Sequence, residues 1–192
     1  EDKLGHGKDM VDRLSNLVGI FQNPDLNFSK NRADGDYILG DAYEYLMKHF
    51  ATESGKSKGQ FYTPAEVSRI MARIIKAEMA EGLNNTVYDP TCGSGSLLLK
   101  VADETPKGIS IYGQEMDNST AALAIMNMWL HNNPLAEIKK GQSTLSSPLH
   151  LSPDGSLKTF DYVVANPPFY YKAWTTGFDP SDDLFGRFDG FG

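Results

Sequence analysis

The chain has 192 residues, of which 40% are hydrophobic and 22% are charged, an ordinary composition for one soluble globular domain. Its formal net charge of -7 argues against strong unaided binding to nucleic acid, because such binding depends on clustered Lys and Arg. No segment approaches the length of a membrane span, and the N-terminus lacks the basic and apolar regions of a signal peptide. The single cysteine, Cys92, excludes an intrachain disulfide and indicates a reducing compartment, so we expect a cytoplasmic protein.

The first third of the chain is predicted to be helical. Asp36 is expected to cap a helix over residues 37–50, whose apolar residues include the three- and four-residue spacings of one helix face. A flexible break, ESGKSKG, follows this helix. Thr63-Pro64-Ala65-Glu66 then has the form of a capping box with proline at the first helical position, which predicts a helix to about Met79.

Strands and helices alternate over the rest of the chain. The predicted elements are a strand at 86–89, a helix from about Ser96, a strand at 109–115, a helix from near Asn118 to 133, a weak strand at 136–141 and a strong strand at 160–166. The run from Tyr162 to Ala165 has no polar alternation, which predicts a buried strand. This alternation predicts an α/β fold with a parallel sheet of the Rossmann type.

The two ends of the chain suggest a part of a larger protein. The chain starts at Glu1 without a methionine, and its last residues, FGRFDGFG, carry no helix or strand signal. We therefore expect a piece of a longer protein, with a helical N-terminal segment at residues 1–58 and the N-terminal part of a larger, truncated domain at residues 59–192.

Polar and glycine-containing stretches follow the three strong strands. They are Asp89 to Gly95, Gln114 to Asp117, and Asn166 to Phe169. Ligands of parallel sheets bind beyond the carboxyl ends of the strands, so we expect these stretches to meet at one edge.

The glycine loop DPTCGSG fits neither of two common phosphate-binding patterns. It lacks the Gly-Lys-Ser/Thr of a P-loop, and Leu98 stands where a dinucleotide fingerprint has its third glycine. The Asp89 carboxylate would repel a pyrophosphate but suits a cationic ligand. Gly93 and Gly95 permit positive φ and a close approach of backbone to a ligand. Taken alone, the loop could also be a plain strand-to-helix turn.

Glu115 makes a nucleoside ligand the better interpretation. It ends the next strand, where an acidic residue can accept hydrogen bonds from both hydroxyls of a ribose. Asp117 is expected to help start the following helix instead. A nucleoside with an ammonium and a sulfonium cation but no phosphate, S-adenosylmethionine, fits two carboxylates better than NAD does.

The motif Asn166-Pro167-Pro168-Phe169 suits methylation of an exocyclic amine such as adenine N6. The Asn166 side-chain oxygen and the Pro167 carbonyl can accept the two amine hydrogens, which leaves the nitrogen lone pair for the methyl group. The two prolines restrict both acceptors, and Phe169 offers a face on which a flipped-out base can stack. The alternative is an ordinary turn that ends a strand.

The ordered set FYTP, DPTCGSG, GQEMD and NPPF resembles the N6-adenine DNA methyltransferases. Residues 39–64 resemble more closely the modification subunit of type I restriction-modification systems. The resemblance implies an S-adenosylmethionine-dependent methyltransferase sheet, incomplete at the C-terminus. It also implies four partners: DNA, a specificity subunit, a restriction endonuclease subunit and a second modification subunit.

The resemblance also assigns roles to single residues. The implied cofactor-binding residues are Phe61, Tyr62, Thr63, Asp89, Thr91, Gly93, Gly95, Glu115, Gln142 and Asn166, with Thr63 at the methionine end of the cofactor and Gln142 at its adenine. The implied catalytic residues are Asn166, Pro167, Pro168 and Phe169. Relatives often have an acidic or amide residue after a glycine that reads the cofactor adenine; this chain has Gly141-Gln142-Ser143 there, and Gln142 is the least specific of these assignments.

Several other residues receive structural interpretations. Arg69, Arg73 and Lys76 are expected to form a solvated helix face, and Trp129 with its neighbouring methionines is expected in the core. The histidines and Cys92 show no metal-ligand spacing, so no metal site is expected. Two other functions remain open: methylation of a protein glutamine or an RNA base, and a non-catalytic assembly module that keeps the cofactor pocket.

Overall fold

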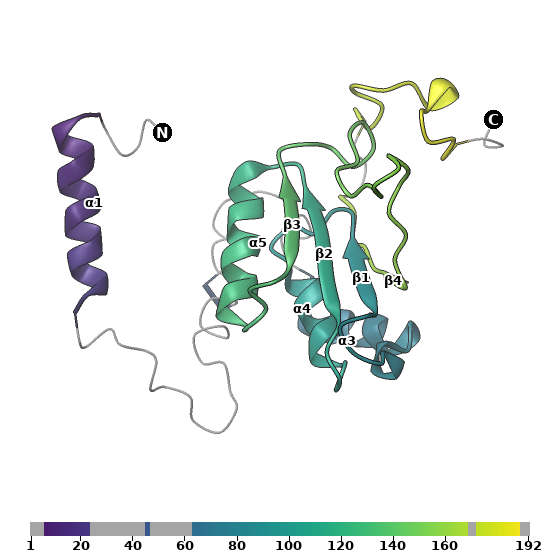
Figure 1. Cartoon of the computed structure of the whole chain (residues 1–192), viewed down its shortest axis with the longest axis horizontal. Helices are drawn as coiled ribbons and strands as arrows, with labels where there is room; N and C mark the ends of the chain where they lie inside the picture. Colours follow the sequence, from purple (N-terminus) through teal and green to yellow (C-terminus); the bar gives the residue numbers. More distant parts are fainter. Residues whose placement is uncertain (1–5, 24–44, 47–62, 169–171, 189–192) are drawn as a thin grey trace. The chain divides into compact units, whose positions relative to one another are not determined.

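The structure, a computed structural model, describes residues 6–23, 45–46, 63–168 and 172–188 (Figure 1). The chain divides into two compact units, residues 1–39 and 40–192. The first unit contains helix α1 (Lys8–Phe21). Of the helix predicted over residues 37–50, only Tyr45 and Leu46 are described, and both are helical. No helix in the described ranges is both long and apolar enough to cross a membrane.

The second unit is built on a parallel sheet with the strand order β3-β2-β1-β4 (Figure 1). The strands are β1 (Thr86–Asp89), β2 (Ser110–Glu115), β3 (Glu137–Lys140) and β4 (Tyr162–Val163). The register places Asp89 beside Gly113 and Tyr88 beside Val163. All four strands therefore run in the same direction, and their carboxyl ends meet at one edge, as the alternating pattern predicts.

The helices of this unit are α3 (Ala65–Ile74), η3 (Ala77–Met79), α4 (Ser96–Asp103), α5 (Asn118–Leu130) and η4 (Pro180–Asp182). Helix α4 packs on α3 and β1, and α5 packs on β2 and β3. The core joins side chains of the sheet to side chains of these helices, among them Val87, Ile111, Leu98, Ala124 and Met128. These residues bury the apolar surface that stabilises the sheet against the helices.

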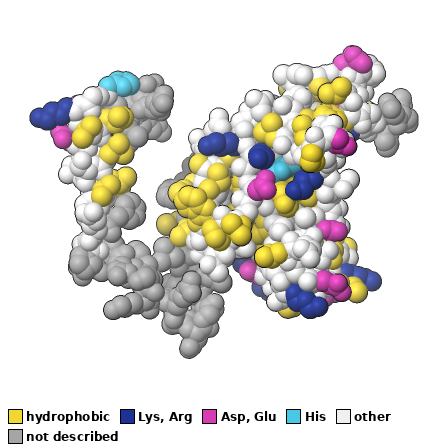
Figure 2. Space-filling view, in the orientation of Figure 1, with side chains coloured by type: hydrophobic (Ala, Val, Ile, Leu, Met, Phe, Trp, Pro, Cys, Tyr) yellow, Lys and Arg dark blue, Asp and Glu magenta, His cyan; other side chains and the backbone are white. Residues whose placement is uncertain are grey.

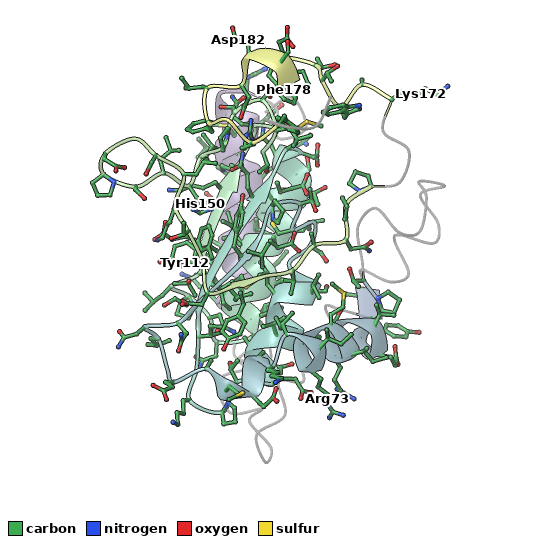
Figure 3. All side chains as sticks on the ribbon, turned by 90° about the vertical axis from the view of Figure 1, so that its right-hand side faces the viewer. Arg73, Tyr112, His150, Lys172, Phe178 and Asp182 are labelled. Atoms are coloured by element: carbon green, nitrogen blue, oxygen red, sulfur yellow. The ribbon has the colours of Figure 1, made fainter. Side chains whose placement is uncertain are left out.

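The opposite face of the sheet carries an aromatic cluster. Tyr88 stacks on Phe160 with 4.4 Å between the ring centroids, and His150 contacts Tyr112 edge-on at 5.5 Å. Figure 3 shows Tyr112 and His150 close together on this side of the molecule. The Lys158 ammonium lies 3.7 Å from the Tyr112 ring centroid, a cation–π contact. The segment between β3 and β4 thus covers the face that the helices leave open.

The start of α3 differs from the predicted capping box. Pro64 is the N-cap residue, no side chain caps the helix, and the helix begins at Ala65. The helix also ends at Ile74 rather than near Met79, because Lys76 adopts a left-handed conformation with φ 56° and a short 3₁₀ turn follows. Thr63 is therefore released from capping and has another partner, described below.

Two burial predictions are wrong in part. In the run from Tyr162 to Ala165, Val163 is 55% exposed at the edge strand β4, whereas Val164 is buried as predicted. Trp129 is 64% exposed and Met126 is exposed too, whereas Met128 is buried as expected. Helix α5 is apolar over most of its circumference, so periodicity did not indicate which face meets the sheet. Figure 2 shows the resulting hydrophobic side chains on the surface over α5.

Gly95 has both a conformational and a packing requirement. Its φ is +79°, and a Cβ there would lie 2.6 Å from Cε of Met128, which is 1% exposed. Gly155 is a matched control, since its φ is +84° but nothing lies within 4 Å of an added Cβ. Gly155→Ala should therefore lose about 1–2 kcal/mol from the left-handed conformation alone.

Gly95→Ala should lose the same amount plus a further ~1 kcal/mol or more, because the buried Met128 must move. Urea unfolding of the two variants measures both losses. Equal losses would show that Met128 yields freely and that packing against α5 does not require glycine at this position.

Candidate active site

The carboxyl edge of the sheet brings two predicted stretches together through one carboxylate. Glu115 Oε2 accepts a hydrogen bond from the Gly93 backbone N–H at 3.1 Å, and Glu115 Oε1 accepts one from the Asp117 N–H at 2.9 Å. The side chain lies between the glycine loop and the turn into α5. A carboxylate has about four acceptor positions, so Glu115 can still accept from the hydroxyls of a ribose.

The glycine loop is held by backbone and side-chain contacts on both sides. Gly93 and Gly95 have φ values of +55° and +79°, as expected for a loop of this kind. The Asn127 side chain of α5 donates to the Ser94 carbonyl at 3.0 Å. Asp117 caps α5 by accepting from the Thr120 N–H at 2.8 Å, as predicted for a helix-start residue. The loop is thus fixed by α5 as well as by the sheet.

Asp89 is a buried carboxylate, only 1% exposed. Its Oδ1 accepts from the Thr91 N–H at 2.9 Å, with the Thr91 hydroxyl at 3.4 Å. Burial, with a smaller contribution from the negative charge of Glu115, raises the pKa of Asp89 to about 7, although the hydrogen bonds from Thr91 lower it. A bound cation would favour the ionised form of Asp89 and offset the free-energy cost of burying its charge.

These residues fit S-adenosylmethionine. The stretches 89–95, 114–117 and 166–168 contain three carboxylates and no Lys or Arg, which suits a cationic ligand without a phosphate. Thr91, one of the predicted cofactor residues, acts in the structure by holding Asp89. Met128 occupies the space beside Gly95, so Gly95 has a packing role in addition to its predicted role in cofactor binding.

Gln114 is a residue that the sequence reasoning missed. It is fully buried, and its Nε2 donates to the carbonyls of Gln142 and Ser147 at 3.1 and 2.9 Å. Its Oε1 accepts from the Leu149 N–H at 2.9 Å. Gln114 therefore fixes the loop that carries the exposed Gln142 next to the Glu115 turn. The sequence signal that could have indicated this role is an amide side chain within a predicted strand, because a buried amide requires hydrogen-bond partners.

Asn166 follows β4 and lies next to Thr63. Its Nδ2 donates to Thr63 Oγ1 at 3.2 Å, across 103 residues of sequence. Thr63 is 8% exposed, and Asn166 is half-buried. Pro167 and Pro168 are exposed at this edge. The remaining predicted site residues, Phe61, Tyr62 and Phe169, lie outside the described residues.

The segment 172–188, after the Asn-Pro-Pro motif, extends beyond the arrowheads of the strands (Figure 1). Arg187 anchors it: one guanidinium nitrogen donates to the Thr144 carbonyl at 3.1 Å, and another lies 2.6 Å from Asp183 Oδ1. The Thr144 hydroxyl in turn donates to the Pro90 carbonyl of the glycine loop. Sequence reasoning missed this connection, because it joins three segments distant in the chain.

Arg69 and Arg73 lie away from this edge. Both form ion pairs with Glu104, at 3.3 and 3.4 Å, in agreement with the predicted solvated face. Figure 3 shows Arg73 at the opposite end of the second unit from Phe178 and Asp182 of the 172–188 segment.

Comparison with known proteins identifies the family. Residues 34–188 match the family model described as N-6 DNA Methylase. The chain belongs to the N-6 DNA methylase family. Membership confirms the resemblance drawn from the four motifs, and with it the N6-adenine methyltransferase reading of the family and S-adenosylmethionine as its cofactor.

Several relatives of this chain are named as methylase subunits of type I restriction enzymes. It is 38% identical over 171 residues to the MpnII methylase subunit of Mycoplasma pneumoniae, covering 83% of this chain and 30% of that protein. It is 37% identical over 164 residues to the MjaVIII methylase subunit of Methanocaldococcus jannaschii, covering 81% and 26% respectively. The chain thus spans about a third or less of the length of these two relatives.

Solved structures confirm the fold class. The methyltransferase subunit of a type I restriction-modification system from Streptococcus thermophilus matches with a TM-score of 0.60 and 32% identity, covering 88% of this chain and 34% of that one. A class I S-adenosylmethionine-dependent methyltransferase from Listeria monocytogenes matches with a TM-score of 0.56 at 16% identity, over 82% of this chain and 50% of that one. The chain therefore has the predicted Rossmann-like methyltransferase sheet.

Asp89→Asn tests the electrostatics of the site, because it keeps an acceptor for the Thr91 N–H and removes the ionisable group. The folded-state pKa of about 7 lies above the ordinary value of 3.8, so Asp89 stabilises the fold below pH 4 and loses this contribution as the pH rises to 7. At pH 8 the variant should be more stable than the wild type by on the order of 2–4 kcal/mol, and near pH 4 the two should agree. Urea unfolding at both values measures the difference.

The same substitution should weaken cofactor binding. Wild-type affinity for S-adenosylmethionine should rise as the pH passes 7, because the ionised carboxylate favours a cation, whereas the affinity of Asp89→Asn should be lower and nearly constant. Calorimetric titrations at pH 5.5, 7 and 8.5 compare them. Asp154→Asn, at an exposed carboxylate, is the control and should bind like the wild type. A wild-type affinity independent of pH would contradict a cation at Asp89.

Proposed function

We propose that this chain is the N-terminal part of the modification subunit of a type I restriction-modification system, which methylates N6 of a flipped-out adenine in DNA. In this proposal residues 1–58 form a helical segment and residues 59–192 begin the catalytic domain. The observation that carries the proposal is the position of Asn166. Its amide follows β4 at the same sheet edge as Asp89 and Glu115, where a cofactor and a target amine have to meet.

The residues around the cofactor have distinct roles in this proposal. S-adenosylmethionine supplies an electrophilic methyl group on a sulfonium. Glu115 accepts hydrogen bonds from the ribose hydroxyls, while its bonds to Gly93 and Asp117 keep it in place. Asp89 favours the positive end of the ligand, and Gln142 contacts the adenine from the loop that Gln114 fixes. Phe61, Tyr62 and Thr63 line the methionine end.

The catalytic motif acts on the target amine. The lone pair of adenine N6 is delocalised into the ring, so the free amine is a poor nucleophile. Asn166 Oδ1 and the Pro167 carbonyl accept its two hydrogens and favour a pyramidal nitrogen whose lone pair is available for the methyl group. Pro168 restricts Pro167 to an extended conformation, and Phe169 provides the stacking face.

Partner subunits complete this function. The net charge of -7 gives the chain little attraction for DNA, so another subunit has to supply much of the phosphate contact. Relatives named methylase subunits of type I enzymes support a complex with a specificity subunit, a restriction subunit and a second modification subunit. The specificity subunit selects the DNA sequence, and the complex acts in the cytoplasm.

Asn166→Ala in the complete subunit, assembled with its partners, tests the mechanism. The methylation rate should fall on the order of 10²–10³-fold, because one oriented acceptor is lost in the transition state. Affinity for the cofactor should stay within about threefold, since Glu115 and Asp89 are unchanged. Transfer of labelled methyl to DNA and calorimetric titration measure the two quantities.

Asn84→Ala is the matched control, because Asn84 is an exposed amide that precedes β1 at the opposite end of the strand. It should leave both quantities unchanged. Glu115→Ala should show the converse pattern to Asn166→Ala, with weaker cofactor binding. Wild-type turnover of the assembled complex with Asn166→Ala would exclude the mechanism, because the group that activates the target amine would then lie elsewhere in the complex and this chain would serve only in assembly.

A further inference from the structure

We propose that Thr63 is a positioning residue that sets the orientation of the Asn166 amide and couples this orientation to the bound cofactor. The inference rests on the proposed function, since it concerns the same site. The Thr63 hydroxyl accepts from Asn166 Nδ2 and turns Asn166 Oδ1 toward the target amine. Its own proton is then donated to the carboxylate of the cofactor.

The chemistry of a primary amide makes such a device necessary. The amide presents an acceptor oxygen on one side and a donor NH₂ group on the other, and a rotation of 180° exchanges them with little change in shape. Only the orientation with Oδ1 toward the target can accept a hydrogen from the amine. The opposite orientation places donors against donors and prevents catalysis.

A hydroxyl alone does not decide between the two orientations, because it can donate to Oδ1 as well as accept from Nδ2. The orientation of the Asn166 amide therefore depends on which group accepts the single proton of the Thr63 hydroxyl. Within the described residues, the bond to Asn166 is the one hydrogen bond of the Thr63 hydroxyl, so its proton is available to a further acceptor. An anionic acceptor would hold that proton and leave the Thr63 oxygen as an acceptor for Nδ2.

The position of Thr63 supplies a site for such an anion. Thr63 lies two residues before Ala65, where α3 begins, and no side chain caps the helix. The first N–H groups of this ten-residue helix have no partner within the helix, and together with the helix dipole they favour a carboxylate. A cofactor carboxylate at α3, the Thr63 hydroxyl and the Asn166 amide would then form one directed chain of hydrogen bonds, with Oδ1 at its far end.

The alternative is that Thr63 only tethers the chain before α3 to the end of β4. Two substitutions separate these roles. Thr63→Val keeps the size and branching of the side chain and removes the hydroxyl, whereas Thr63→Ser keeps the hydroxyl and removes a methyl group. If Thr63 acts only as a tether through packing, Thr63→Val should keep its role better than Thr63→Ser does. If Thr63 acts through a directed chain of hydrogen bonds, Thr63→Ser should keep its role and Thr63→Val should not.

The experiment uses the complete subunit assembled with its partners. Calorimetry compares the affinity for S-adenosylhomocysteine with that for its decarboxylated analogue, and 2-aminopurine fluorescence reports entry of the target base. In the wild type and in Thr63→Ser, the carboxylate should improve affinity by about the same factor, and turnover should agree within about threefold. In Thr63→Val, the advantage of the carboxylate should shrink ~10-fold and turnover should fall ~10²-fold, with the 2-aminopurine signal retained.

A double substitution then tests the coupling. In an Asn166→Ala background, Thr63→Val should cause no further loss of turnover but should still reduce the advantage of the carboxylate. Wild-type turnover in Thr63→Val, or equal damage from Thr63→Ser and Thr63→Val, would overturn the inference while leaving the proposed function intact. Wild-type turnover in Asn166→Ala would instead overturn the proposed function itself.

Discussion

The parallel pairing of β1 with β2 is the constraint on which the site depends. It places Asp89 beside Gly113, and the ladder continues past the strand end, where the Cys92 N–H donates to the Gln114 carbonyl at 3.1 Å. This approach requires glycine at 113, because a Cβ there would lie 3.0 Å from Cys92 Sγ and 2.9 Å from Ile138 Cδ1. The glycine loop and the acidic turn are therefore two parts of one backbone arrangement, and their separation is set by the spacing of hydrogen-bonded strands.

The site includes a group that works against the stability of the fold. Asp89 is nearly fully buried and lies in the field of Glu115, so its ionised form is unfavourable in the free protein. Helix α5 stabilises the glycine loop next to Asp89: Met128 fills the space beside Gly95, and the Asn127 side chain donates to the Ser94 carbonyl. A rigid loop with a carboxylate of raised pKa is preorganised for a cation, since binding the cation relieves an existing electrostatic penalty.

Long-range hydrogen bonds hold together the segments that meet at the carboxyl edge of the sheet. Gln114 holds the loop of Gln142, and the Thr144 hydroxyl joins that loop to the Pro90 carbonyl. Arg187 ties the segment after the Asn-Pro-Pro motif to the same loop, and Thr63 binds Asn166. Each of these bonds joins residues at least 28 positions apart. Two sets of polar contacts therefore hold this edge: one joins the glycine loop, the loop of Gln142 and the segment of Arg187, and the other joins Thr63 to Asn166.

The sequence by itself determined the order of strands and helices, the glycine loop, the acid at the end of β2 and the family, because these depend on local periodicity and on motifs at strand ends. Only the tertiary structure decided which partner each polar side chain has. Thr63 was predicted to cap α3 but binds Asn166. No structural role was predicted for Gln114 or Arg187, because contacts between residues tens of positions apart leave no local sequence pattern. The exposure of Trp129 and Val163 likewise depended on which face of α5 meets the sheet and on the edge position of β4. Whether a side chain is buried depends on which elements pack against it, and the fold decides that packing.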